Sequence, residues 1–351
     1  MATKLEISEL DFDGIKDNLK TFLRQQDEFT DYDFEGAGMS TLLDVLAYNT
    51  HYLGYNANML ANEMYLDSAD LRSSVVSLAK QVGYTPTSAT SSSAIVDVLI
   101  NNASGSTLTM NAGTQFTTTV DGQSYAFVNK EDVSITPIDG VFKFSNLSIF
   151  EGSYLNYKYT VSTSDIDQRF VIPNDGVDTS TLRIKVQESS SDSTTQTYKL
   201  ATGITGLDST SKVYFLQEIE TGRFEVYFGD GVLGKAVADG NIIIMDYITC
   251  NRNAPNGATT FTLSGSIGGF SSATVTTVEG AANGSAKETI KSIKYNAPRD
   301  YTAQDRAVTA DDYKVLVKTL YANAQAVQVY GGEDAEVPDY GKVYISIKAK
   351  S

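Results

Sequence analysis

Residues 34–86 constrain the fold of this chain more than any other stretch, because they predict two helices that are apolar on more than one side. Between residues 39 and 65, one stripe at spacings of three, four and seven consists of Met39, Leu42, Leu46, Leu53, Ala57, Leu60 and Met64. A second stripe consists of Leu43, Ala47, Tyr52, Tyr55 and Met59. A helix with so little polar surface is not stable alone in water. We therefore expect it to lie between other helices, including helices of other chains.

Two asparagines interrupt the apolar pattern of this long helix. Asn49 follows Leu46 by three residues, and Asn56 follows Leu53 by three, so both fall near the first stripe. A polar residue in an apolar seam weakens packing but fixes the register and number of the partners. The sequence thus indicates a defined assembly instead of unspecific association.

Two shorter helices flank the long one. The first is predicted to start near Asp11, with apolar residues at 15, 19, 22 and 23 on one face. The third follows Asp67 or Ser68 as its cap, and Gly83 and Pro86 end it. A loop at residues 27–38 separates the first two helices.

Charge and composition exclude several classes of protein. The 351 residues include 27 Lys and Arg and 43 Asp and Glu, giving a formal net charge of −16. A surface this negative argues against general binding of nucleic acid or anionic membranes. The chain has no apolar run of about 18 residues, so we predict no membrane span. The beginning of the chain is acidic and does not resemble a secretory signal.

The composition changes at residue 86, where Ser, Thr, Gly and Asn become abundant. Short β-type runs between turn signals lie at residues 94–100, 124–128, 181–187, 212–219, 223–228 and 241–249. They predict one or two mainly antiparallel β domains, a sandwich or a barrel. Residues 188–196 predict a hairpin tip or an inserted loop, and residues 251–284, poor in charge, predict a region made mostly of loops.

Mixed structure returns at residue 285. Ser285 with Glu288 predicts a capping box that opens a short helix, with Pro298 just beyond the end of that helix. Thr309 with Asp312 predicts a second capping box and a second helix.

Two strands follow at residues 324–330 and 342–350. Because one helix on a two-stranded sheet is a poor independent fold, we expect either that the native protein continues past Ser351 or that another chain completes the sheet. The predicted class is α+β. It comprises an N-terminal helical bundle segment (1–85), a central, mainly antiparallel β region (86–284) and a small C-terminal α+β domain (285–351) that is incomplete as it stands.

Few residues offer catalytic or metal-binding chemistry. His51 is the only histidine and falls within the long helix, so we interpret it as structural. Cys250 is the only cysteine, which excludes a disulfide within the chain, and its place at the end of an apolar strand predicts a half-buried structural thiol. The acidic residues 11–18 lack the spacing of a calcium loop. We predict no catalytic residue, metal site or cofactor, although 43 acids leave a carboxylate pair for glycoside hydrolysis open.

A glycine-rich stretch, FGDGVLGK at residues 228–235, partly matches the spacing of a phosphate-binding loop. Ala236 occupies the position that requires a hydroxyl, and a strand follows where the motif needs a helix. Asp230-Gly231 between two β-type runs predicts a tight turn instead.

Three stretches carry a resemblance to a known family. FEGAGMSTLLDVLAYNTHYLGYNANMLANEMYLDSADLRSSVVSLAKQVGYTP (34–86) closely resembles the N-terminal helical region of the baseplate wedge proteins of contractile-tailed, T4-like bacteriophages. RFEVYFGDGVLGK (223–235) and SIKYNAPRDYTAQDRAVTADDYKVLV (292–317) resemble two signature stretches of the wider baseplate J-like family. The resemblance thus touches all three regions.

The resemblance implies a structural subunit of the virion tail baseplate, assembled in the host cytoplasm, and not an enzyme. Family members form the inner ring around the tail hub, with two copies in each of six wedges. Their helices join a neighbouring wedge subunit in a core bundle, their C-terminal domains pair between copies, and the ring widens when the sheath contracts. The implied partners are another copy of this chain, neighbouring wedge proteins, the tail hub and sheath-initiating proteins.

The resemblance also implies residue roles. The bundle residues would be Leu42, Leu46, Asn49, Leu53, Asn56, Leu60 and Met64. The junction to the C-terminal pairing domain would contain Pro298, Arg299, Asp305, Ala307, Val308, Thr309, Asp312 and Tyr313. T4-like members are considerably longer, and their additional part lies after the position of Ser351. Apart from the resemblance, the glycine and proline residues in loops 27–38 and 297–308 indicate that these loops join rigid domains, which would allow the ring two geometries.

Two other functions remain open on the sequence. A β-rich receptor-binding or adhesin protein of a virion would form homotrimers, with the helices as a stalk. A cell-wall hydrolase would need two carboxylates facing each other in a cleft.

Overall fold

The fold is known from a computed structural model that describes residues 11–26, 36, 38–101, 105–138, 140–165, 167–201, 203, 206–303, 306–321, 324–335 and 337–349. The chain divides into two compact units, Met1–Gln81 and Val82–Ser351. Five α-helices and 17 strands make the described part an α+β protein, which confirms the predicted class.

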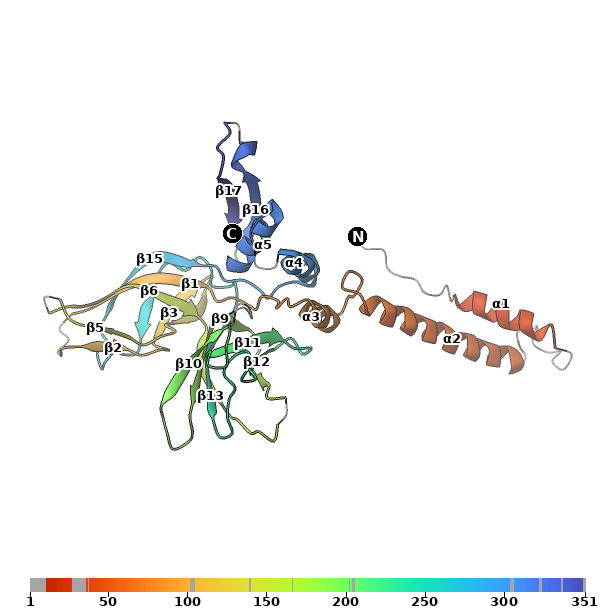
Figure 1. The fold of residues 1–351 in the computed structure, drawn as a ribbon, viewed down its shortest axis with the longest axis horizontal. Helices are drawn as coiled ribbons and strands as arrows, with labels where there is room; N and C mark the ends of the chain where they lie inside the picture. The colour runs from red at the N-terminus through yellow and green to blue at the C-terminus, as the bar shows by residue number, and fades with distance from the viewer. Residues whose placement is uncertain are drawn as a thin grey trace. The chain divides into compact units, whose positions relative to one another are not determined.

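The first unit contains the three predicted helices, α1 (Phe12–Leu23), α2 (Gly38–Glu63) and α3 (Arg72–Gln81) (Figure 1). Helix α1 packs against α2, and an ion pair between Lys16 Nζ and Asp44 Oδ1 at 2.5 Å joins them. The carboxylate of Glu63 at the end of α2 accepts from the backbone N–H groups of Asp70 and Leu71. Gly83, at φ +82°, follows α3 in the left-handed conformation expected of a helix stop.

The second unit begins with a six-stranded sheet in the order β14-β3-β4-β6-β1-β15. Its bounds are β1 (Ser93–Ile100), β3 (Gln115–Val120), β4 (Gln123–Val128), β6 (Phe142–Glu151), β14 (Thr262–Ser264) and β15 (Thr274–Ala282). All its neighbouring strands are antiparallel, and β2 (Leu108–Met110) and β5 (Val133–Ile135) form a small additional pair. Strand β1 alternates half-buried and buried residues, as expected for a strand with one face on a core.

A seven-stranded sheet, in the order β7-β13-β9-β10-β11-β12-β8, comes entirely from the chain between β6 and β14. Its bounds are β7 (Ser153–Thr160), β8 (Phe170–Val171), β9 (Val177–Gln187), β10 (Thr195–Leu200), β11 (Val213–Glu218), β12 (Phe224–Phe228) and β13 (Ile242–Thr249). Strands β9 and β10 form the predicted hairpin around residues 188–196, and β10 and β11 are a parallel pair.

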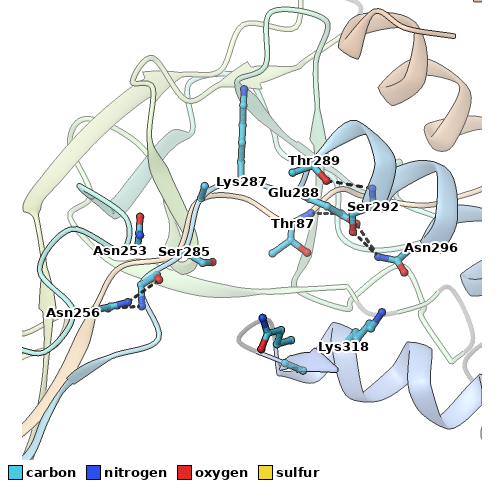
Figure 2. Close-up of a pocket in the computed structure, with 14 residues that line it drawn as sticks. Thr87, Asn253, Asn256, Ser285, Lys287, Glu288, Thr289, Ser292, Asn296 and Lys318 are labelled. Carbon is cyan, nitrogen blue, oxygen red and sulfur yellow. Dashed lines mark hydrogen bonds between the residues drawn. The ribbon is translucent and has the colours of Figure 1, made fainter. Parts of the chain in front are cut away.

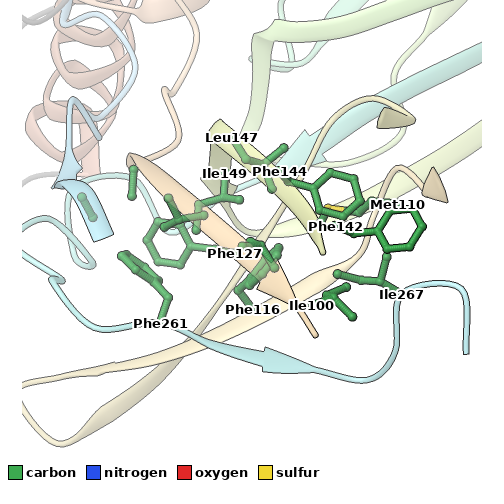
Figure 3. Close-up of a cluster of buried hydrophobic side chains, with 14 of the residues drawn as sticks. Ile100, Met110, Phe116, Phe127, Phe142, Phe144, Leu147, Ile149, Phe261 and Ile267 are labelled. Atoms are coloured by element: carbon green, nitrogen blue, oxygen red, sulfur yellow. The ribbon is translucent and has the colours of Figure 1, made fainter. Parts of the chain in front are cut away.

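Each sheet has its own hydrophobic core. The core of the six-stranded sheet is rich in phenylalanine, with the rings of Phe127 and Phe261 in edge-to-face contact at 4.9 Å between centroids (Figure 3). The core of the seven-stranded sheet centres on Ile184, Ile243 and Met245, all fully buried. Because the two cores share no residue, the sheets are separate packing units.

Polar groups join the two sheets where the chain crosses between them. The buried carboxylate of Glu151, at the end of β6, accepts from the backbone N–H of Asn251 at 2.8 Å and from its side-chain amide at 2.7 Å. Between β6 and β7, Gly152 adopts φ +129°, and a Cβ there would collide with the carbonyl of Thr249. The crossing therefore requires glycine at this position.

Residues 251–284 are mostly loops, as predicted, but they also contain two strands that the sequence did not indicate, β14 and β15. Strand β15 runs for nine residues within this segment and pairs with β1 along its length. The sequence of β15 carries little apolar signal, because the strand lies at the edge of the sheet and most of its residues are exposed. A strand stabilised mainly by its neighbour's hydrogen bonds needs little hydrophobic periodicity of its own.

The C-terminal part of the second unit contains α4 (Ile290–Ala303), α5 (Ala310–Leu320), β16 (Ala324–Gly331), the short 3₁₀ helix η1 (Gly332–Asp334) and β17 (Val343–Ala349). The capping box of α5 is confirmed: Thr309 Oγ1 accepts from the N–H of Asp312, and Asp312 accepts from the N–H of Thr309 at 2.8 Å. Strands β16 and β17 form the predicted antiparallel pair.

The capping box predicted at Ser285 is wrong. Ser285 is in extended conformation and pairs with Thr90 through two backbone hydrogen bonds of 3.0 Å, so it cannot cap a helix. The helix begins later, at Ile290, where Thr289 Oγ1 accepts from the N–H of Ser292. Pro298 lies inside α4 instead of beyond it. Burial of Ile293 and Ala297 on one face of α4, together with its contacts to α5, outweighs the hydrogen bond that proline removes.

Candidate functional site

Helix α2 buries only one of its sides. Leu43, Ala47, Gly54 and Ala61 are buried, at spacings that place them along one face. The residue before each of them belongs to the predicted seam: Leu42, Leu46, Leu53 and Leu60. Consecutive residues of an α-helix point about 100° apart around the helix axis. The seam therefore faces a different direction from the buried side.

The whole predicted seam is exposed. Leu42, Leu46, Leu53, Leu60 and Met64 retain 58%, 53%, 61%, 64% and 67% of their accessible surface. Asn49 and Asn56 are exposed as well. The structure thus brings the seven seam residues onto one surface along α2. Exposed apolar surface of this extent on a soluble protein usually marks an interaction site.

A third side of α2 is also apolar and exposed. It consists of Val45, Tyr48, Tyr52, Tyr55 and Met59, and we call it the tyrosine face. The rings of Tyr48 and Tyr52 lie 5.6 Å apart. The sequence placed Leu43 and Ala47 in one stripe with Tyr52, Tyr55 and Met59, but the structure separates them, since the first two are buried and the other three are exposed.

The second unit holds a polar pocket of about 510 Å³ where α4 meets the β domains (Figure 2). Glu288 is its most connected residue. Its carboxylate accepts from the N–H of Thr87 at 3.1 Å, from Ser292 Oγ at 2.6 Å and from the amide of Asn296 at 2.8 Å. It also accepts from the hydroxyl of Tyr84 at 2.9 Å.

The segment 84–91 passes this pocket and forms hydrogen bonds with several distant parts of the second unit. Thr85 donates to the carbonyl of Leu216 in β11, and the hydroxyls of Ser88 and Thr179 in β9 lie 2.8 Å apart. Thr90 pairs with Ser285 beside the six-stranded sheet. We call residues 84–91 the connecting segment, because its hydrogen bonds tie the two sheets and α4 together.

The sequence did not reveal this junction. Tyr84 and Glu288 are far apart in the chain, and Glu288 carried a local interpretation as part of a capping box. Thr90 and Ser285 exchange two backbone hydrogen bonds, and this pairing places Glu288 beside Tyr84. No sequence pattern indicates such a pairing between distant segments.

The described junction residues lie on α4 and at the start of α5. Arg299 lies on α4, with its guanidinium carbon 3.6 Å from the ring centroid of Tyr295. Thr309 and Asp312 form the cap of α5, and Tyr313 is half-buried in the next position. Asp305 lies outside the described residues, as does most of loop 27–38. The predicted loop 297–308 begins inside α4.

Family models match three stretches of the chain. Residues 11–84 match the helical domain of baseplate wedge protein gp6-like proteins, residues 157–258 match the third domain of the bacteriophage baseplate wedge protein gp6, and residues 309–351 match C-terminal domain I of the baseplate structural protein gp6. The chain belongs to the gp6-like baseplate wedge family. The helical match includes α1, α2 and α3 and therefore the whole exposed seam.

Two individual proteins are similar to this gp6-like chain. The baseplate wedge protein gp6 of Enterobacteria phage T4 is 29% identical over 370 residues, which cover 97% of this chain and 54% of the T4 protein. The chain thus spans about half the length of that relative. A chain in a cryo-EM structure of the anti-feeding prophage baseplate is 13% identical, with a TM-score of 0.32, over 92% of this chain and 67% of that chain.

The single histidine and the single cysteine of the gp6-like chain are both half-buried side chains. His51 is half-buried on α2. Cys250 is half-buried, its Sγ lies 3.5 Å from the carbonyl of Gly176, and burial raises the pKa of its thiol. Within the described ranges, no three His, Cys, Asp or Glu side chains are grouped to hold a metal ion. Over the same residues, no helix is both long and apolar enough to cross a membrane.

The glycine-rich stretch after β12 is a loop closed by its own backbone. Asp230 Oδ1 accepts from the N–H groups of Val232 and Leu233, both at 2.9 Å. Gly231 donates to the carbonyl of Gly234, and Gly229 packs so closely on Gly234 that it leaves no space for a side chain. Those N–H groups are occupied within the loop, which differs from the open cradle of a phosphate-binding loop.

Proposed function

We propose that this chain is a structural subunit of a phage tail baseplate wedge and that the seam of α2 is its principal assembly surface. In this role the chain joins the inner ring around the tail hub. The seam packs against a neighbouring wedge subunit and a second copy of the chain in a helical bundle. The observation that carries the proposal is the exposure of all seven seam residues in a segment that matches the gp6-like helical domain.

The energetics of the seam support a bundle. Fully burying a leucine or methionine side chain contributes about 1.5–3 kcal/mol. Five such side chains are more than half exposed along α2. Asn49 and Asn56 would restrict the register in which partner helices pack, because an unpaired amide in a seam is costly.

The C-terminal strands support pairing between copies. All seven residues of β17 are exposed, including Val343, Ile345 and Ile347, which project to one side. Strand β17 has β16 as its only neighbour in the described part of the chain, so its other edge offers backbone groups to an additional strand. We propose that this edge contributes to the contact between copies that closes the ring, and that the ring rearranges when the sheath contracts.

The seam can be tested by placing charges on it. The double variant Leu46→Asp/Leu53→Asp should no longer co-purify with the neighbouring wedge subunit of the same phage. Burying an unpaired carboxylate costs several kcal/mol at each position. Ser77→Asp is the control, because Ser77 is exposed on α3 and lies outside the seam of α2. Light scattering coupled to size-exclusion chromatography would measure the mass of each complex.

Retention of the partner by the double variant would refute the bundle role of α2. A homotrimer formed by the wild-type chain alone would point instead to a receptor-binding protein. Clearing of peptidoglycan by the purified chain, free of co-purifying lysozyme, would indicate a hydrolase. Circular dichroism should show that both Asp variants keep the β structure of the second unit.

A further inference from the structure

A second, smaller pocket of about 210 Å³ lies between α4, α5 and β16. Four charged residues line it: Arg299 from α4 and Asp311, Lys314 and Lys318 from α5. Their formal charges add to +2, in a chain whose net charge is −16. This pocket is therefore opposite in sign to the chain as a whole.

The cations are gathered around one aromatic ring. The guanidinium carbon of Arg299 lies 3.6 Å from the ring centroid of Tyr295, and Lys318 Nζ lies 5.3 Å from the same centroid. Cation–π contacts hold both groups in place, and the neutral ring does not cancel their positive charges. Lys314 pairs with Asp311 at 2.9 Å, and Asp311 is the single carboxylate among the described residues that line this pocket.

The local field is positive enough to affect that carboxylate. The hydrogen bond and charge of Lys314, followed by the charge of Arg299, hold the pKa of Asp311 below its usual value. Like charges held together by the fold repel one another, and an incoming anion relieves that repulsion.

The pocket continues into the larger pocket beside Glu288, since both share Asn296 and Lys318. The larger pocket adds Lys287 and hydroxyl and amide groups, including Thr87 and Ser285 (Figure 2). Glu288 is engaged by four donors. Together the two pockets form a polar trough with positive side chains at intervals, a shape that suits an extended segment better than a single ion.

We propose that this trough binds an acidic peptide segment of another protein, with its side-chain carboxylates between Arg299, Lys314 and Lys318. Charge complementarity selects this occupant. A nucleic acid would bring its phosphates against an acidic chain, whereas an acidic peptide needs only the local cations. The proposal does not depend on the bundle role of α2.

The full chain would be titrated at low salt into fluorescein-labelled hexaglutamate, with binding followed by fluorescence anisotropy. The double variant Arg299→Gln/Lys318→Gln should bind about tenfold or more weakly, because both cations at the ring lose their charge. Lys199→Gln is the control, since Lys199 is an exposed lysine on β10 and should not affect binding. Raising the salt concentration should weaken binding by the wild type.

Lys314→Gln provides a further variant in the pocket that keeps the Tyr295 contacts intact, and thermal melting would show which variants fold. Absence of hexaglutamate binding by the wild type would overturn the proposal. Unchanged affinity in every folded variant would also overturn it. Equal or tighter binding of an oligothymidylate through the same residues would reassign the trough to nucleic acid.

Discussion

The hydroxyl of Tyr84 donates to the carboxylate of Glu288 at 2.9 Å, although 204 positions separate the two residues. Burial, followed by the negative charge of Glu288, raises the pKa of Tyr84 well above its usual value. Tyr84 therefore keeps its proton and remains a donor at neutral pH. The pair attaches the connecting segment to the start of α4.

Replacement of Glu288 should destabilise the second unit. Glu288→Ala leaves the donors of Tyr84, Ser292 and Asn296 without their shared acceptor, so we expect a loss of about 2–3 kcal/mol in the free energy of unfolding. Urea titration followed by circular dichroism would measure it. Glu220→Ala, at an exposed position, should stay within about 0.5 kcal/mol of the wild type. Equal midpoints for both variants would contradict the role of Glu288.

The crossing between the sheets should not tolerate a side chain at Gly152. Gly152→Ala places a Cβ against the carbonyl of Thr249 and the side chain of Ile248, in addition to the strain of a positive φ. We expect more than about 3 kcal/mol of destabilisation or failure to fold. Gly240→Ala separates the two effects, because Gly240 has φ +77° but open space around it and should lose only about 1 kcal/mol. Similar losses in the two variants would show that the close approach at Gly152 is unimportant.

Cys250 should be a slow thiol. Burial raises the pKa of its thiol above the usual value, so the reactive thiolate is scarce at neutral pH. We expect the native chain to react with Ellman's reagent at least about tenfold more slowly than free cysteine at pH 8. In guanidinium chloride the same thiol should react at once. Equal rates in native and denatured protein would exclude a protected thiol.

Glu151 should make stability depend on pH. Burial raises the pKa of Glu151 above 4.5 despite its hydrogen bonds from Asn251. Between pH 4.5 and the raised native value, the folded chain keeps a proton that the unfolded chain has lost, so the free energy of unfolding falls as the pH rises through this interval. Glu151→Gln should remove that slope, whereas Glu131→Gln, at an exposed position, should keep it. Urea titrations at a series of pH values would measure the difference, and parallel pH profiles for wild type and Glu151→Gln would disprove this effect.

Local sequence patterns correctly predicted those helices and strands whose own residues show the apolar periodicity or the capping motif. The apolar stripes predicted α2 within two residues at each end, and the apolar run at 241–249 predicted β13. The capping box at Thr309 was also correct, because both of its hydrogen bonds lie within one turn of helix.

Contacts between distant segments could not be predicted. Strand β15 depends on pairing with β1, and Ser285 is extended because of Thr90. For the candidate site, the stripes identified the seam residues, but they could not show that α1 packs on the side of α2 that contains Leu43 and Ala47. Which side of a helix remains exposed is a property of tertiary packing.

The hydrogen bonds between Glu151 and Asn251 bring together the two points at which the chain leaves and re-enters the six-stranded sheet. All seven strands between them form the other sheet, around a core of their own. The seven-stranded sheet is thus an inserted domain with adjacent ends. Such an insert can be lost, gained or exchanged between related proteins by a single graft that leaves the host domain closed. Residues 152–250 are accordingly the natural segment to excise as one module, with Glu151 joined to Asn251 through a short linker.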